Sequence, residues 1–111
     1  MNNQDNMLIA EFMGMENTLN GWKDVWGLLS EEDKTNYYNK LKFDTDPDWL
    51  IRLLKRIDDL DATSYRNVQG EEEEWEVPFR KLSSEEIEVL YNKCVHFTKW
   101  WDEVDLMEKL Y

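Results

Sequence analysis

The stretch DPDWLIRLLKRIDDL, residues 46–60, decides the fold. An aspartate at the N-cap position and a proline at the first helical position are both preferred where a helix begins. Apolar residues then recur on one stripe at helical spacing: Trp49, Leu50, Leu53, Leu54, Ile57 and Leu60. Basic residues occupy the opposite face, so the segment predicts an amphipathic helix over residues 47–60.

A longer helix is expected near the end of the sequence. Ser83-Ser84-Glu85-Glu86 has the pattern of a capping box, with Ser83 as the N-cap and Glu86 at the third helical position. Apolar residues follow at alternating steps of three and four: Ile87, Leu90, Cys94, Phe97, Trp101 and Val104. The spacing predicts a helix that continues to about residue 105 and packs on the core of the domain.

Two more helices are expected in the first part of the chain. Residues 3–13 have an apolar face at helical spacing, and Gly14 stands where a glycine commonly ends a helix. Residues 22–29 show the same spacing, and residues 30–33 look like a new N-cap followed by acids. Tyr37, Tyr38 and Leu41 fit two alternatives, a continued helix or the approach to a short extended stretch over residues 40–44.

Strand character is confined to residues 65–79. Trp75, Val77 and Phe79 alternate with polar residues and a proline, which predicts a strand with one buried face. Pro78 cannot donate a hydrogen bond, so this strand is expected at an edge or to break near its end. Gly70-Glu71 is typical of a turn that leads the chain back along residues 65–69, giving a hairpin.

These elements predict one fold class. Helices and a local hairpin in this order favour α+β, with three to four helices packed on a small antiparallel β-hairpin or sheet and a long C-terminal helix. We expect a single compact acidic domain over residues 1–111.

The charge of the chain limits its partners. Thirteen Lys and Arg stand against 25 Asp and Glu, a net charge of −12, which would repel bare nucleic acid or an anionic membrane surface and favours a basic partner. No apolar run approaches the roughly 20 residues of a membrane span. The sequence begins without the features of a secretory signal, and its single cysteine excludes an intrachain disulfide. We therefore expect a cytoplasmic protein.

Candidate catalytic and metal-binding groups are few. Cys94 and His96 are two residues apart on a predicted helix, so they point about 200° away from each other and cannot form a thiol dyad. The run DTDPD, residues 44–48, begins like a calcium-binding loop but lacks the glycine and the glutamate that such a loop needs. The sequence predicts a protein without catalytic activity, cofactor or metal ion.

The strongest functional signal is an acidic segment, residues 58–76, which holds eight acids and one base, Arg66. It could be a solvated hairpin face that protects an edge strand from aggregation. It could instead mimic phosphates, because alternate side chains of a strand lie about 6.8 Å apart, close to the spacing of successive phosphates. The predicted partner-binding residues are Asp58, Asp59, Asp61, Glu71, Glu72, Glu73, Glu74, Glu76 and Trp100.

Two neighbouring tryptophans close the last helix. Trp100 and Trp101 cannot both face one apolar stripe, so one of them is expected to be partly exposed. It would act either as a lid on the N-terminal helix or as an interaction anchor, a role in which Trp is common.

Three motifs point to a family. They are LIAEFMG at residues 8–14, Asp48-Trp49-Leu50, and FTKWW at residues 97–101, in this order. The chain resembles a group of small uncharacterised proteins from bacteriophages and prophages of the Bacteroidetes, which carry similar motifs in the same order. That group has no established activity, so the resemblance implies a setting, and small acidic phage proteins often inhibit host machinery, as anti-CRISPR proteins do.

Two hypotheses of function follow. The first is a non-catalytic phage-derived inhibitor, such as an anti-CRISPR protein, that binds a basic nucleic-acid-binding effector in the bacterial cytoplasm through its acidic surface. The alternative is a small phage structural or adaptor protein that binds a partner through Trp100, Tyr111 and the last helix. Either protein is expected to be a monomer or a weak dimer.

Overall fold

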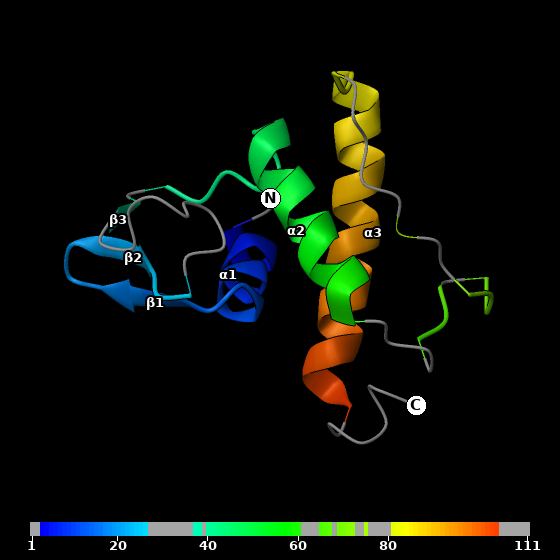
Figure 1. The fold of residues 1–111 in the computed structure, drawn as a ribbon, viewed down its shortest axis with the longest axis horizontal. Coiled ribbons are helices and arrows are strands. Elements are labelled where there is room, and N and C mark those ends of the chain that lie inside the picture. Colours follow the sequence, from blue (N-terminus) through cyan, green and yellow to red (C-terminus); the bar gives the residue numbers. More distant parts are fainter. Residues whose placement is uncertain are drawn as a thin grey trace.

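The computed structural model describes residues 3–26, 37–38, 40–60, 65–67, 69–72, 75 and 81–104. Its elements are the helices α1 (Asn3–Phe12), α2 (Pro47–Leu60) and α3 (Ser84–Glu103) and the strands β1 (Met15–Thr18), β2 (Gly21–Asp24) and β3 (Tyr37–Tyr38). The strands form an antiparallel sheet in the order β1-β2-β3. The sheet lies at one end of the molecule next to α1, and α2 and α3 lie beyond α1 (Figure 1). The predicted α+β class and the long C-terminal helix are confirmed.

Helix α1 follows the prediction, and Gly14 ends it. The Gly14 N–H donates to the carbonyl of Glu11 at 3.1 Å, and its φ of +72° is a left-handed conformation that suits glycine. The chain then enters β1 directly.

The prediction of a helix over residues 22–29 is wrong for residues 22–24, which lie in a strand. Gly21–Asp24 is strand β2, which pairs with β1 from Met15↔Asp24 to Thr18↔Gly21. The turn between them is closed by the Thr18 hydroxyl, which donates to the carbonyl of Gly21 at 2.7 Å. This local hairpin prevails over the helical spacing of the apolar residues. Residues 27–36 lie outside the described residues, and the extended pair that follows is β3, not residues 40–44.

Helices α2 and α3 are confirmed. The Asp46 carboxylate accepts the backbone N–H of Asp48 at 2.9 Å, and α2 has the predicted bounds. At α3 the capping box is complete, since Ser83 and Glu86 each accept the other's backbone N–H at 3.2 Å. Helix α3 ends at Glu103, slightly earlier than predicted.

The hairpin predicted over residues 65–79 is not found in the part of this segment that the structure describes. Residues 65–67 and 69–72 turn at Gly70 as expected, but neither they nor Trp75 belong to a strand. Residues 74 and 76–79 of the predicted strand lie outside the described residues. The Asn67 side chain accepts the backbone N–H groups of Gln69 and Glu71, which a strand ladder would otherwise use. Tyr65 and Trp75 pack on α3 instead.

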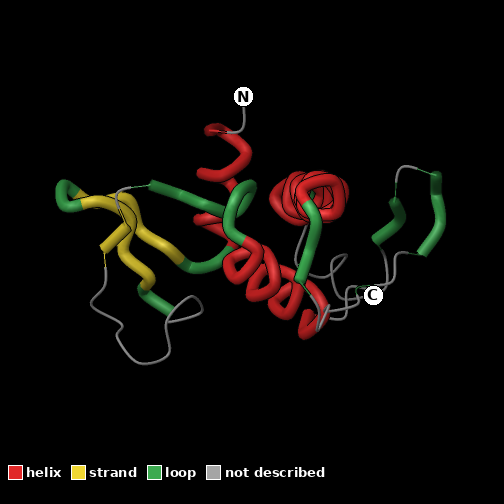
Figure 2. The backbone as a smooth tube through the Cα atoms, turned by 90° about the horizontal axis from the view of Figure 1, so that it is seen from above, coloured by secondary structure: helices red, strands yellow, loops and turns green. Residues whose placement is uncertain are grey.

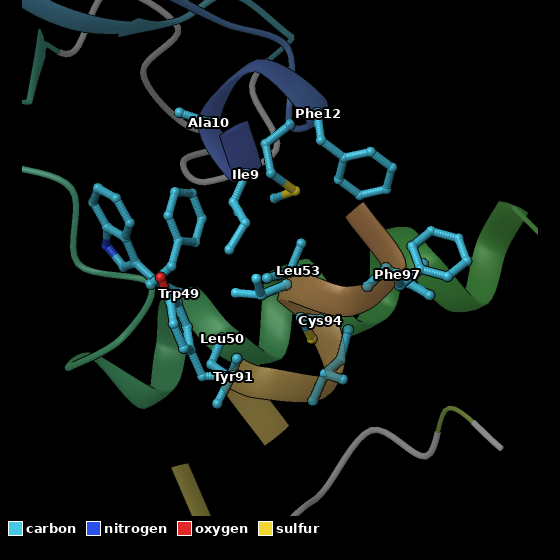
Figure 3. Packing of buried hydrophobic residues seen from close by; sticks show 14 of the residues in the cluster. Ile9, Ala10, Phe12, Trp49, Leu50, Leu53, Tyr91, Cys94 and Phe97 are labelled. Atoms are coloured by element: carbon cyan, nitrogen blue, oxygen red, sulfur yellow. The ribbon is translucent and has the colours of Figure 1, made fainter. Parts of the chain in front are cut away.

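The core lies between the three helices. Ile9 of α1, Leu53 of α2 and Cys94 of α3 converge in its centre, and all three are fully buried (Figure 3). A chain of hydrogen bonds links α3, α1 and the loop before α2, and it begins where the Tyr91 hydroxyl donates to Oδ1 of Asn6 at 2.9 Å. The Asn6 amide nitrogen in turn donates to the Asp44 carboxylate at 3.1 Å. Burial raises the pKa of Tyr91 well above its usual range, so this hydroxyl remains a donor.

Candidate interaction surface

The described part of the acidic segment between α2 and α3 contains a short turn. We call the described part of residues 65–75 the acidic turn. The Asn67 side-chain oxygen accepts the backbone N–H groups of Gln69 and Glu71, at 3.0 and 3.1 Å, and the Asn67 N–H donates to the Glu71 carbonyl at 2.9 Å. Gly70 has a φ of +79°, which a glycine adopts without steric cost. Two residues three apart, Asn67 and Gly70, therefore specify the turn.

Two aromatic residues hold the acidic turn on α3. Tyr65 is buried and Trp75 is half-buried, and their ring centroids are 6.0 Å apart. Both rings contact Phe97, with centroid distances of 4.9 and 5.4 Å. The turn projects from these two residues to the end of the molecule opposite the sheet (Figures 1 and 2).

Trp100 lies beside the base of the acidic turn. Its ring centroid is 5.2 Å from that of Tyr65 and 5.6 Å from that of Phe97, and the side chain is half-buried. Trp101 instead packs on the N-terminal helix, 5.9 Å from Phe12, and is half-buried as well. Trp101 therefore lies on the N-terminal helix as a lid would, and the interaction role of Trp100 stays a prediction. Trp100 thus contacts the acidic turn at its base, through Tyr65.

The predicted acids do not form one row. Glu71 and Glu72 are exposed in the turn, whereas Asp58 and Asp59 are exposed in the last turn of α2. Because Glu72 lies in no strand, the spacing expected of a phosphate mimic is absent from the described residues. The remaining predicted acids lie outside the described residues: Asp61, Glu73, Glu74 and Glu76.

The acids at the end of α2 work against helix stability. A helix ends on the negative pole of its dipole, which favours a base there and disfavours an acid. The last turn of α2 carries Asp58 and Asp59 and no base. Their position is therefore explained better by solubility or by a partner than by the stability of the helix.

Basic and aromatic side chains border the acidic turn, and their position there was not predicted. Arg66 forms an exposed ion pair with Glu72 at 3.6 Å, which contributes little to stability. The Lys93 ammonium lies 5.1 Å from the Trp75 ring centroid, and the His96 ring lies 5.9 Å from that of Tyr65. Positions 93, 96 and 100 follow helical spacing, so this face of α3 was detectable in principle.

Cys94 is not available as a nucleophile. Burial raises the pKa of its thiol to about 12, so almost none of it is thiolate at neutral pH. Within the described parts of the chain, no group of three or more His, Cys, Asp or Glu residues could hold a metal ion. None of the described helices is both long enough and apolar enough to cross a membrane.

Comparisons with known proteins do not assign the chain to a family. No family model matches it, and neither a curated protein nor a solved structure does.

Proposed function

We propose that this protein is a non-catalytic, phage-derived inhibitor acting in the bacterial cytoplasm. It binds a basic nucleic-acid-binding effector, such as a CRISPR effector nuclease, through the acidic turn and the acids at the end of α2. One observation supports the proposal most strongly. Glu71 and Glu72 are exposed on a turn, and both ends of this turn pack on α3.

A turn of this kind suits recognition because its charges are ordered before binding. The Asn67 hydrogen bonds fix the backbone, so a partner pays little conformational entropy to engage the two carboxylates. A groove lined with Lys and Arg would accept them in place of phosphates. The net charge of −12 would add long-range attraction to such a partner and accelerate association.

A pull-down from the bacterial host identifies the partner, and a pair of variants then tests the surface. The test variant is Glu71→Gln with Glu72→Gln. The control is Glu11→Gln with Glu16→Gln, which removes the same charge from exposed residues of α1 and β1. We expect the test variant to bind the captured partner at least about tenfold more weakly, mainly through slower association, and the control to bind almost as wild type. Equal losses in both variants would mean that only the net charge matters.

Salt separates this function from the adaptor alternative. Binding through the acidic turn should weaken steeply between about 50 and 300 mM salt, whereas binding through Trp100 should change little. Because Trp100 adjoins the turn, a mixed interface would lose affinity both on adding salt and on Trp100→Ala. A partner held equally well at both salt concentrations would contradict the proposal and favour the adaptor.

A further inference from the structure

Trp26 is a large exposed side chain that is nevertheless fixed in place. It is 54% exposed and follows Val25, which is 41% exposed, directly after β2. The indole rests against the backbone of Gly14, so closely that a Cβ atom at that glycine would overlap the ring. An exposed tryptophan whose ring packs against the backbone is held in one orientation before it contacts another molecule.

Arg56 of α2 lies against the same indole. Its guanidinium carbon is 5.2 Å from the centroid of the Trp26 ring and 5.7 Å from that of Phe12. Phe12 belongs to the core, whereas Trp26 is at the surface. The arginine therefore bridges a buried ring and an exposed ring, an arrangement that its planar, weakly hydrated guanidinium favours.

One hydrogen-bond donor of Arg56 has no partner among the described residues. Its Nε atom is buried and has no hydrogen-bond partner. The ion pairs Arg66–Glu72 and Lys99–Asp5 join other described side chains. In a chain with 25 acids and 13 bases, the contacts that the structure shows for the Arg56 guanidinium are with the rings of Phe12 and Trp26.

We propose that Trp26 and Arg56 form a docking site for a segment of a partner protein in which an aspartate or glutamate stands next to an apolar residue. The guanidinium would pair with the carboxylate through its terminal nitrogens, because the Nε atom is buried. The indole and Val25 would cover the apolar neighbour. Trp and Arg are the residues that dominate binding energy at protein interfaces. This site goes beyond the proposed function, because it selects a negative charge while the acidic turn selects positive ones.

The test is an NMR titration of the full-length protein with two dipeptides, acetyl-Glu-Leu-amide and acetyl-Gln-Leu-amide. We expect the Glu dipeptide to shift the Trp26 indole N–H and the Arg56 Nε–H signals saturably. The Gln dipeptide, which lacks only the charge, should bind at least about tenfold more weakly. Equal responses to both dipeptides, or none to either, would overturn the proposal. A response to inorganic phosphate without one to the Glu dipeptide would also overturn it.

Variants locate the response. Arg56→Gln and Trp26→Ala should each lose most of the Glu-dipeptide response, whereas Lys55→Gln, an exposed neighbour on α2, should keep it. A folded Arg56→Gln protein that still binds the Glu dipeptide like wild type would refute the site. If Arg56→Gln does not fold, the comparison of the two dipeptides on the wild-type protein still decides.

Discussion

Helix α2 and the acidic turn follow one another in the sequence but are specified in different ways. The signals that define α2 lie within its own residues and the Asp46 cap, and its apolar stripe supplies five buried side chains. The acidic turn has two local signals, Asn67 and Gly70, and its position depends on packing against Phe97, far along the chain. The pattern of neighbouring residues was sufficient to predict α2. It could not show that the acidic turn packs on Phe97, which is distant in the sequence.

The largest effect is expected where the acidic turn meets α3. Phe97 is 1% exposed and contacts the rings of Phe12, Tyr65, Trp75, Trp100 and Trp101. Replacing it by alanine should lower the free energy of unfolding by about 3–5 kcal/mol and release the turn from the helix. Chemical denaturation measures the change.

The matched control is Val89→Ala, on the same helix but 61% exposed. It should alter the free energy of unfolding by about 0.5 kcal/mol or less. Similar losses in both variants would mean that Phe97 is not the centre of the aromatic cluster, and the contrast between the acidic turn and α2 would fail.

The same contrast explains which parts of the fold were predictable. Caps and apolar stripes identified α1, α2 and α3 because helical periodicity and helix ends are encoded by neighbouring residues. Strand β2 was missed because Trp22, Val25 and Trp26 have helical spacing, while pairing with β1 depends on the turn at Gly21. At the candidate surface, the exposure of Glu71 and Glu72 was predictable from their charge. The irregular backbone of the acidic turn was not predictable, nor was the packing of Tyr65 on Phe97 or of Lys93 on Trp75.

An intermediate effect is expected at the hydrogen bond that joins α1 to α3. Tyr91→Phe removes the hydroxyl that donates to Asn6 at 2.9 Å and leaves a buried amide oxygen without this donor. The free energy of unfolding should fall by about 1–2 kcal/mol, with the helices intact by circular dichroism. This variant sharpens the comparison because it should weaken the helical core without altering the acidic turn. A loss below about 0.3 kcal/mol would show that water replaces the hydroxyl.

The smallest effect is expected at the tip of the acidic turn. Gly70 has a φ of +79°, and nothing lies within 4 Å of the position that a Cβ atom would take. Gly70→Ala should therefore cost only the left-handed conformation, about 1 kcal/mol, measured by denaturation beside the exposed control Gln69→Ala. Gly14→Ala has a similar φ but must also displace Trp26, so it should cost clearly more. Equal costs at the two glycines would mean that backbone conformation alone sets both, and a cost at Gly70 as large as that of Phe97→Ala would place the turn within the core.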